Sequence, residues 1–218
     1  MSHEIRTPMN GILGFADLLK TPDLLIEKQQ QYIQIIEKSG RRMLNIIKDI
    51  IDISKIEAGI IQVNFEESDM NEIFDDIHNF FKPEIDHKEI QFLCNIPLPS
   101  ENVIINTDRE KLVAILTNLL KNAIKFTVSG SIEFGYEVKE EHIEILVKDS
   151  GIGIPINKQK VIFERFIQAD IEDKMARQGS GLGLAISRAY VELLGGQIWV
   201  VSEEGKGSGF HFTIPFNT

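Results

Sequence analysis

The sequence predicts an α+β protein, in which a helical hairpin precedes an α/β sandwich whose mixed sheet is covered by helices on one face. Three observations support this fold class. Apolar residues recur at helical spacing through the first 60 residues. The rest of the chain intersperses strand-like segments with helix-like ones. Neighbouring strands joined by polar turns are typical of antiparallel hairpins, which would make the sheet mixed. We expect the two domains at residues 1–59 and 60–218.

Composition narrows the class of protein. The 218 residues carry a net charge of −10, which disfavours a nucleic-acid binder because phosphate contacts need clustered cations. No apolar run approaches the roughly 18 residues of a membrane-spanning helix, and the polar N-terminus does not resemble a signal peptide. Cys94 is the single cysteine, so an internal disulfide or a cysteine-built zinc site is excluded. These features predict a soluble, acidic, cytoplasmic protein.

The first domain is predicted to contain a long helix and a shorter one. Residues 28–57 contain no proline, and Gly59 is a plausible C-terminal cap. A shorter amphipathic stretch ends at Thr21-Pro22-Asp23. The apolar residues that repeat every seven positions on the long helix are Ile36, Met43 and Ile50, with Ile46 and Ile53 offset by three. The pattern therefore predicts a helical hairpin.

This hairpin has more apolar surface than its two helices can bury. Ile47 and Ile51 widen the stripe beyond what one partner helix would cover. Small scaffolds without staples depend on oligomerisation, so the pattern favours a dimeric four-helix bundle. The alternative is that the stripe packs on the second half of the same chain.

The second domain alternates strands and helices. Strong helical periodicity marks residues 108–126, and Pro83 is expected to follow the end of an earlier helix. The expected strands span residues 60–65, 89–96, 131–138, 142–147, 197–202 and 209–215, and the expected helices span residues 69–81, 108–126 and 183–194.

The helix over residues 108–126 carries polar side chains on one face. Asn118 and Asn122 are i and i+4, with Lys125 one turn further on. Amide oxygens are hard ligands suited to magnesium, and an ammonium group beside them suits phosphate. The alternative is an ordinary polar stripe on a helix packed by Leu119, Leu120 and Ile124.

Two glycine-rich segments follow. Gly151 and Gly153, in the segment 149–155, allow the backbone to approach a ligand closely, and the Asp149 carboxylate could accept a hydrogen bond from the exocyclic amine of adenine. The alternative is a common Asp-Ser-Gly turn. Glycines in the segment 179–184 would expose backbone N–H groups to an anion at the start of a helix. The polar stretch 168–178 between them is typical of a mobile loop over a ligand.

Taken in order, these segments resemble the motifs of the sensor histidine kinases of two-component signalling. The segment 3–8, His-Glu-Ile-Arg-Thr-Pro, resembles the phosphoacceptor box, and residues 118–126 resemble the asparagine box. Residues 149–153 and 179–183 resemble the two glycine boxes, with the phenylalanine motif 163–166 between them. The resemblance covers essentially the whole chain, and Met9-Asn10-Gly11 and Lys125-Phe126-Thr127 resemble its hybrid branch. Because His3 stands so early, we expect the chain to be a fragment whose leading helix is shortened.

The resemblance implies a phosphorylation site in the first domain and an ATP site in the second. His3 would be the nucleophile, Glu4 would accept the N–H of the other ring nitrogen and fix the tautomer, and Thr7 would position a water for dephosphorylating a response regulator. Asn122 would ligate Mg²⁺, with Asn118 assisting. The implied ATP-binding residues are Asn118, Asn122, Lys125, Phe126, Asp149, Gly151, Gly153, Phe166, Gly179, Ser180, Gly181, Leu182 and Gly183.

The family implies a homodimer that uses Mg-ATP to phosphorylate its own histidine. The phosphoryl group would then pass to an aspartate in the receiver domain of a response regulator. Two alternatives remain open at this stage. The first is a dimeric scaffold that binds ATP without phosphorylating itself, and the second is an ATPase of the same nucleotide-binding superfamily.

Overall fold

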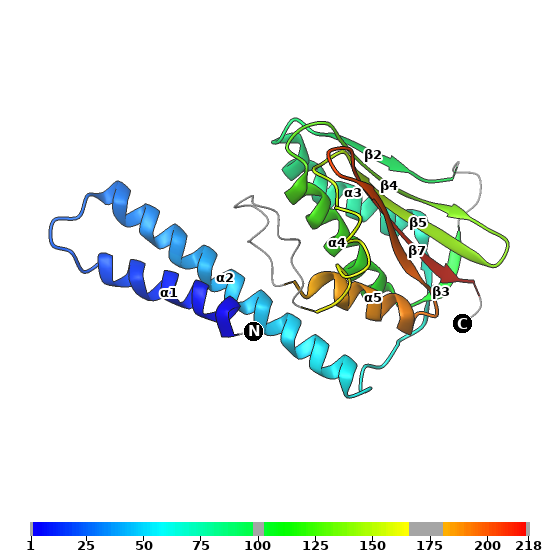
Figure 1. Ribbon diagram of the computed structural model, residues 1–218, viewed down its shortest axis with the longest axis horizontal. Helices are drawn as coiled ribbons and strands as arrows, with labels where there is room; N and C mark the ends of the chain where they lie inside the picture. Colours follow the sequence, from blue (N-terminus) through cyan, green and yellow to red (C-terminus); the bar gives the residue numbers. More distant parts are fainter. Residues whose placement is uncertain (1, 98–102, 166–180, 217–218) are drawn as a thin grey trace. The chain divides into compact units, whose positions relative to one another are not determined.

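The computed structural model describes residues 2–97, 103–165 and 181–216. The chain divides into two compact units, Met1–Ile60 and Ile61–Thr218 (Figure 1). Across the described residues, no helix combines the length and apolarity needed to cross a bilayer.

The first unit is an antiparallel helical hairpin. Helix α1 (Ser2–Leu18) packs along α2 (Ile26–Glu57), and the rings of Phe15 and Tyr32 lie 5.3 Å apart between their centroids. Ile46 and Ile53, one heptad apart on α2, are buried. Gly59 follows the C-cap with φ +65°, a left-handed conformation that favours glycine. The predicted hairpin and its C-terminal glycine are therefore confirmed.

The second unit is built on a five-stranded sheet with the order β2-β4-β5-β7-β6. Strand β2 pairs parallel with β4, and the remaining pairs are antiparallel, which confirms a mixed sheet. A second sheet joins β1 and β3 antiparallel. The strands are β1 (Glu66–Asp69), β2 (Gln91–Asn95), β3 (Ile104–Thr107), β4 (Ser131–Val138), β5 (His142–Asp149), β6 (Ile198–Glu203) and β7 (Gly207–Pro215).

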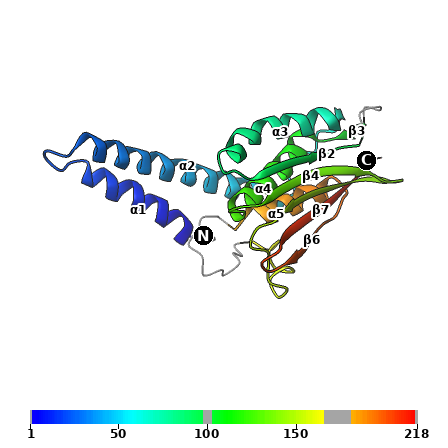
Figure 2. The same ribbon diagram turned by 90° about the horizontal axis from the view of Figure 1, so that it is seen from above.

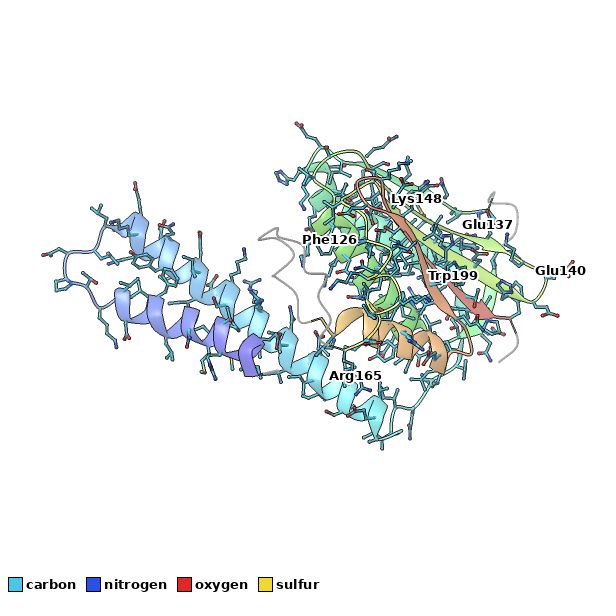
Figure 3. The ribbon with its side chains drawn as sticks, viewed as in Figure 1. Phe126, Glu137, Glu140, Lys148, Arg165 and Trp199 are labelled. Atoms are coloured by element: carbon cyan, nitrogen blue, oxygen red, sulfur yellow. The ribbon has the colours of Figure 1, made fainter. Side chains whose placement is uncertain are left out.

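Three helices cover one face of the large sheet: α3 (Met70–Asp86), α4 (Arg109–Phe126) and α5 (Gly183–Leu193) (Figure 2). Asp69 and Asp108 cap the first two helices by accepting hydrogen bonds from backbone N–H groups of the first turn. Along β4, alternate residues such as Ile132 and Phe134 are buried against these helices. On β6, Trp199 lies on the face of the sheet that the helices do not cover (Figure 3).

Residues 60–65 do not form the expected strand. Side chains hold this segment in place instead of a strand partner: the Asn64 N–H donates to the Asp108 carboxylate (2.9 Å), and the Lys111 ammonium donates to the Gln62 carbonyl (2.8 Å). Burial alone would raise the pKa of the Asp108 carboxyl. The Lys111 ammonium and the backbone N–H groups of Asn64 and Lys111 outweigh burial and hold this pKa below its usual value. Strand pairing begins only at Glu66.

One further expectation needs correction, and one strand was missed. Helix α3 continues through Pro83 to Asp86, because Ile85 is fully buried in the core and the His87 N–H bonds the Pro83 carbonyl (3.4 Å). Strand β3 was not expected, since it has only four residues and one of them, Ile104, is exposed.

Candidate functional site

Helix α4 presents two asparagines from the side not buried in the core. Its apolar residues, including Leu119 and Ile124, are buried against the sheet. Asn118 and Asn122 are only half-buried, as the i, i+4 spacing predicts. Farther along, the Lys125 ammonium lies 4.5 Å from the centroid of the Phe126 ring. The last turns of α4 therefore combine amide oxygens with a cation.

Asp149 ends strand β5 and is buried, with 8% of its surface exposed. Its carboxylate accepts the N–H of Gly151 at 2.9 Å and a backbone N–H from Ser208, the residue opposite it on β7. Burial raises the pKa of Asp149 above its usual value, and the two backbone donors only partly offset this. A buried carboxylate with a raised pKa is a candidate for a binding site.

Close backbone approaches join the Asp149 loop to the end of α4. A Cβ on Gly151 would come within 2.3 Å of the Phe126 carbonyl oxygen, which also accepts the N–H of Ile152 (3.4 Å). Gly153 has φ +70°, and a Cβ there would come within 2.1 Å of the Glu203 carbonyl oxygen. Only glycine fits either position. The loop that follows Asp149 is therefore packed directly against the C-terminal end of α4.

The N-terminus of α5 lies beside Asn118. A Cβ on Gly183, the first residue of α5, would come within 2.3 Å of Asn118 Oδ1. The preceding residues are Gly181, at φ +68°, and Leu182, whose buried apolar side chain cannot cap the helix. Backbone N–H groups and the helix dipole make such a terminus suitable for phosphate.

The structure thus brings together the residues from three of the predicted segments. Asn118 lies against Gly183, and Phe126 lies against Gly151 beside Asp149. Three predicted residues, Phe166, Gly179 and Ser180, lie outside the described residues, as does the stretch 168–178.

The predicted phosphoacceptor residues lie in the first turns of α1, in the other unit. Glu4 is half-buried and Thr7 is exposed. The side chain of His3 lies outside the described part of the structure.

Sequence reasoning missed three serines around this site. Ser208 is buried opposite Asp149, and its hydroxyl lies 3.0 Å from that of Ser202. Ser187, buried on α5, accepts a hydrogen bond from Asn118. A serine between two glycines in a strand, as in Gly207-Ser208-Gly209, was the available signal for the first. The other two depend on pairings between distant elements.

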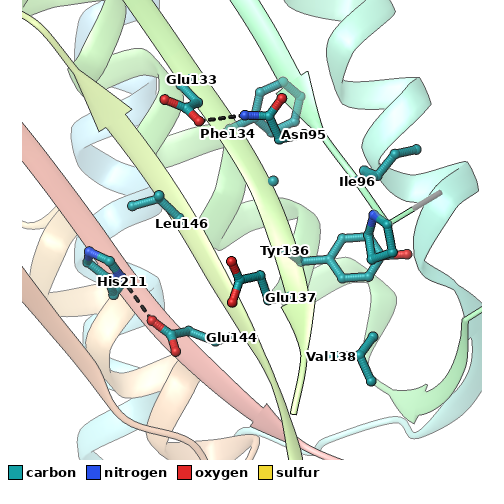
Figure 4. A pocket seen from close by; sticks show the side chains of 12 residues that line it. Asn95, Ile96, Glu133, Phe134, Tyr136, Glu137, Val138, Glu144, Leu146 and His211 are labelled. Atoms are coloured by element: carbon teal, nitrogen blue, oxygen red, sulfur yellow. Dashed lines mark hydrogen bonds and ion pairs between the residues drawn. The ribbon is translucent and has the colours of Figure 1, made fainter.

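A separate groove of about 610 Å³ crosses the open face of the large sheet (Figure 4). Its lining includes Glu133, which accepts a hydrogen bond from Asn95, and Glu144, which pairs with His211. None of the predicted nucleotide-binding residues lines it. The candidate site therefore lies on the helical side of the unit, at the ends of α4 and α5.

The described residues of this site fit a magnesium–nucleotide complex. Gly151 and Gly183 let their segments pack directly against Phe126 and Asn118 of α4, where a Cβ would clash. Amide oxygens on α4 suit Mg²⁺, and the buried Asp149 carboxylate is available as an acceptor. This geometry defines an ATP-binding α/β sandwich. Accordingly, residues 107–218 match the family model described as "Histidine kinase-, DNA gyrase B-, and HSP90-like ATPase", and residues 1–59 match "His Kinase A (phospho-acceptor) domain". The chain belongs to the sensor histidine kinases, which are protein-histidine kinases.

Known sensor kinases are similar to the whole chain. Autoinducer 2 sensor kinase/phosphatase LuxQ of Vibrio vulnificus strain YJ016 is 39% identical over 99% of this chain and 26% of its own length. The chain spans about a quarter of the length of the first curated relatives it matches.

Two solved structures share this fold. Histidine kinase ThkA in complex with response regulator protein TrrA has a TM-score of 0.79 at 29% identity, covering 99% of this chain and 60% of that one. Full-length ShkA in complex with AMPPNP has a TM-score of 0.76 at 30% identity, covering 100% of this chain and 45% of that one.

Proposed function

We propose that this chain is a kinase core that uses Mg-ATP to phosphorylate His3 and passes the phosphoryl group to an aspartate of a response regulator. The single observation that carries the proposal is the convergence of Asn118, Gly183 and the Asp149 loop at the ends of α4 and α5. The matched phospho-acceptor region supports the choice of His3.

Each end of ATP has a candidate partner at this site. The Asp149 carboxylate accepts a hydrogen bond from the exocyclic amine of adenine, and Ser208 lies opposite it on β7. The phosphates lie at the N-terminus of α5, where backbone N–H groups face the anion, and Lys125 offsets their charge. The similar ShkA structure was solved with AMPPNP, which supports nucleotide binding here.

Asn122 and Asn118 would hold Mg²⁺ through their side-chain oxygens. Both lie on one face of α4, and Asn118 Oδ1 lies next to the first residue of α5. When bound, Mg²⁺ neutralises charge on the phosphates. The contribution of the chain itself is positioning and electrostatic stabilisation.

In the transfer step, a lone pair on one imidazole nitrogen of His3 forms a bond to the γ-phosphorus. The bond from this phosphorus to the oxygen shared with the β-phosphate breaks, and ADP leaves with that electron pair. Glu4 accepts a hydrogen bond from the N–H of the other ring nitrogen and so stabilises the positive charge that develops during attack. Attack requires the neutral imidazole, because only this form has a free lone pair on one ring nitrogen.

The phosphoryl group then passes to a receiver aspartate, on a separate protein or in the same full-length chain. The ThkA structure contains response regulator TrrA, and LuxQ is called a sensor kinase/phosphatase. The ThkA complex supports this class of partner, and the LuxQ name supports a dephosphorylation step. We assign Thr7, one helical turn after His3 and exposed on α1, to positioning a water for dephosphorylation of the regulator.

The metal assignment predicts the behaviour of Asn122→Ala. We expect this variant to lose autophosphorylation by about 100-fold or more, because an amide oxygen that holds Mg²⁺ is removed while the apolar face of α4 is unchanged. Phosphate incorporation from γ-labelled ATP should be measured across a Mg²⁺ titration. Asn79→Ala, the same change on an exposed turn of α3, is the matched control.

Wild-type rates and an unchanged Mg²⁺ requirement in Asn122→Ala would exclude it as a ligand. Turnover of ATP by the wild-type chain without a phosphoprotein would instead favour an ATPase. Nucleotide binding without either reaction would favour a scaffold.

The first unit supports a homodimer. Leu44, Ile47 and Ile51 form a second stripe on α2 that α1 does not cover, and Leu44 is 68% exposed. The spacing i, i+3, i+7 is that of a helix-bundle seam, so we assign the stripe to the same helix of a second copy.

Leu44→Glu is expected to weaken self-association by roughly 100-fold, because the substitution removes from both copies a leucine that the dimer would bury and places two carboxylates in the seam. Sedimentation velocity across a concentration series would measure the shift toward monomer. Asn45→Glu introduces the same charge on an exposed neighbouring position outside the stripe and should leave association unchanged. Equal association of both variants would contradict the assignment.

A further inference from the structure

Ser187 lies on α5 with its hydroxyl directed at α4. It is 1% exposed, and its Oγ accepts a hydrogen bond from Asn118 Nδ2 at 2.8 Å. A buried hydroxyl is costly unless it is paired, so this contact is a specific link between the two helices.

In this contact the Asn118 amide directs its nitrogen at Ser187, which leaves its oxygen as the end nearer to the start of α5. Nδ2 is directed at Ser187, so Oδ1 is the opposite end, and it is the atom that a Cβ on Gly183 would meet at 2.3 Å. Gly183 begins α5. The amide oxygen is therefore the atom nearest the helix terminus, whereas Nδ2 lies farther from the same Cβ position, at 3.2 Å, and contacts Ser187.

The orientation matters because the two ends of an amide have opposite chemistry. The oxygen is an acceptor and a hard ligand for Mg²⁺, whereas the nitrogen only donates and cannot ligate a cation. Without a fixed partner, the amide could rotate and present the nitrogen to the metal.

We propose that Ser187 is a positioning residue, which holds the Asn118 amide with its oxygen toward the magnesium–phosphate complex. The inference rests on the proposed function, since it needs Mg-nucleotide at this site. Partners that orient metal ligands typically affect metal affinity or activity by 10- to 100-fold. We expect a value near the lower end because Asn118 assists Asn122.

The test is Mg²⁺-dependent nucleotide binding, measured by calorimetry with ADP at increasing Mg²⁺. For Ser187→Ala, we expect half-maximal enhancement of ADP binding to need roughly tenfold more Mg²⁺. Affinity for ADP without metal should stay within about twofold. Ser187→Cys, which keeps the volume but offers a weak acceptor, should behave in the same way. Ser187→Thr keeps the hydroxyl and should restore most of the Mg²⁺ response.

Two controls separate positioning from a general structural effect. Ser68→Ala removes another buried serine hydroxyl of this unit, far along the chain from α5, and should leave the Mg²⁺ response unchanged. In the Asn118→Ala background, Ser187→Ala should have no further effect on the Mg²⁺ response, because it acts through that amide.

The outcomes distinguish this inference from the proposed function. If wild-type protein binds Mg-ADP and Ser187→Ala shows the same Mg²⁺ dependence, the positioning role is wrong and the proposed site stands. Equal weakening of ADP binding with and without metal would also contradict positioning. If wild-type protein binds no nucleotide, the proposed function itself fails.

Discussion

His3→Ala is expected to abolish the incorporation of phosphate from γ-labelled ATP, because no other side chain of the phosphoacceptor box offers a nitrogen lone pair for attack. The label on the wild-type protein should be labile in acid and stable in base, as a phosphorus–nitrogen bond to imidazole requires. ATP binding should be unchanged, since the predicted nucleotide residues lie in the other unit. The effect is therefore on chemistry and not on affinity.

His87→Ala is the matched control, since this histidine is exposed at the end of α3 and has no assigned role. It should incorporate label at the wild-type rate. Label that persists at wild-type level in His3→Ala would place phosphorylation on another residue.

Asp149→Asn is expected to weaken ATP binding by roughly 10- to 150-fold, the equivalent of about 1.5–3 kcal/mol for a hydrogen bond to a charged group. The structure supplies the reason. Backbone N–H groups of Gly151 and Ser208 both donate to this carboxylate. An asparagine has one oxygen to satisfy them, so its amide nitrogen would meet the amine of adenine. Equilibrium binding of ATP and GTP should show that the variant loses discrimination between the two bases.

The same residue predicts how binding depends on pH. Burial raises the pKa of Asp149, so its protonation begins at a higher pH than for an ordinary aspartate. The protonated group loses acceptor capacity, and ATP affinity should therefore fall as the pH decreases toward the raised pKa. For folding the sign is opposite: protonation is easier in the native state, so this group favours the native state increasingly as the pH falls through the raised pKa.

The ratio of wild-type to Asp149→Asn affinity should be measured between pH 7.5 and pH 5, because titration of ATP itself cancels in the ratio. We expect this ratio to shrink as the pH falls. Asp75→Asn, an exposed aspartate on α3, should track the wild-type protein at every pH. A constant ratio for Asp149→Asn would mean that its carboxylate does not contact the ligand.

Much of the fold could be predicted because the signals are local. The helical hairpin follows from apolar spacing on α2, and the shared face of Asn118 and Asn122 follows from the geometry of one helix. The alternating residues of β4 and β5 indicate a hairpin for the same reason. Where an element is held by distant partners, local signals fail. Residues 60–65 are fixed by Asp108 and Lys111, and α3 passes Pro83 because Ile85 packs in the core.

The sequence by itself determined the chemical types in the candidate site and their order along the chain. Only the tertiary structure decided which of them meet. Asp149 faces Ser208 through the register of β5 and β7, and Asn118 reaches Ser187 through the packing of α4 on α5. The residues of each pair are far apart in sequence. Periodicity reports which face a residue occupies on its own element, whereas register and helix packing depend on how whole elements bury their apolar surfaces against one another.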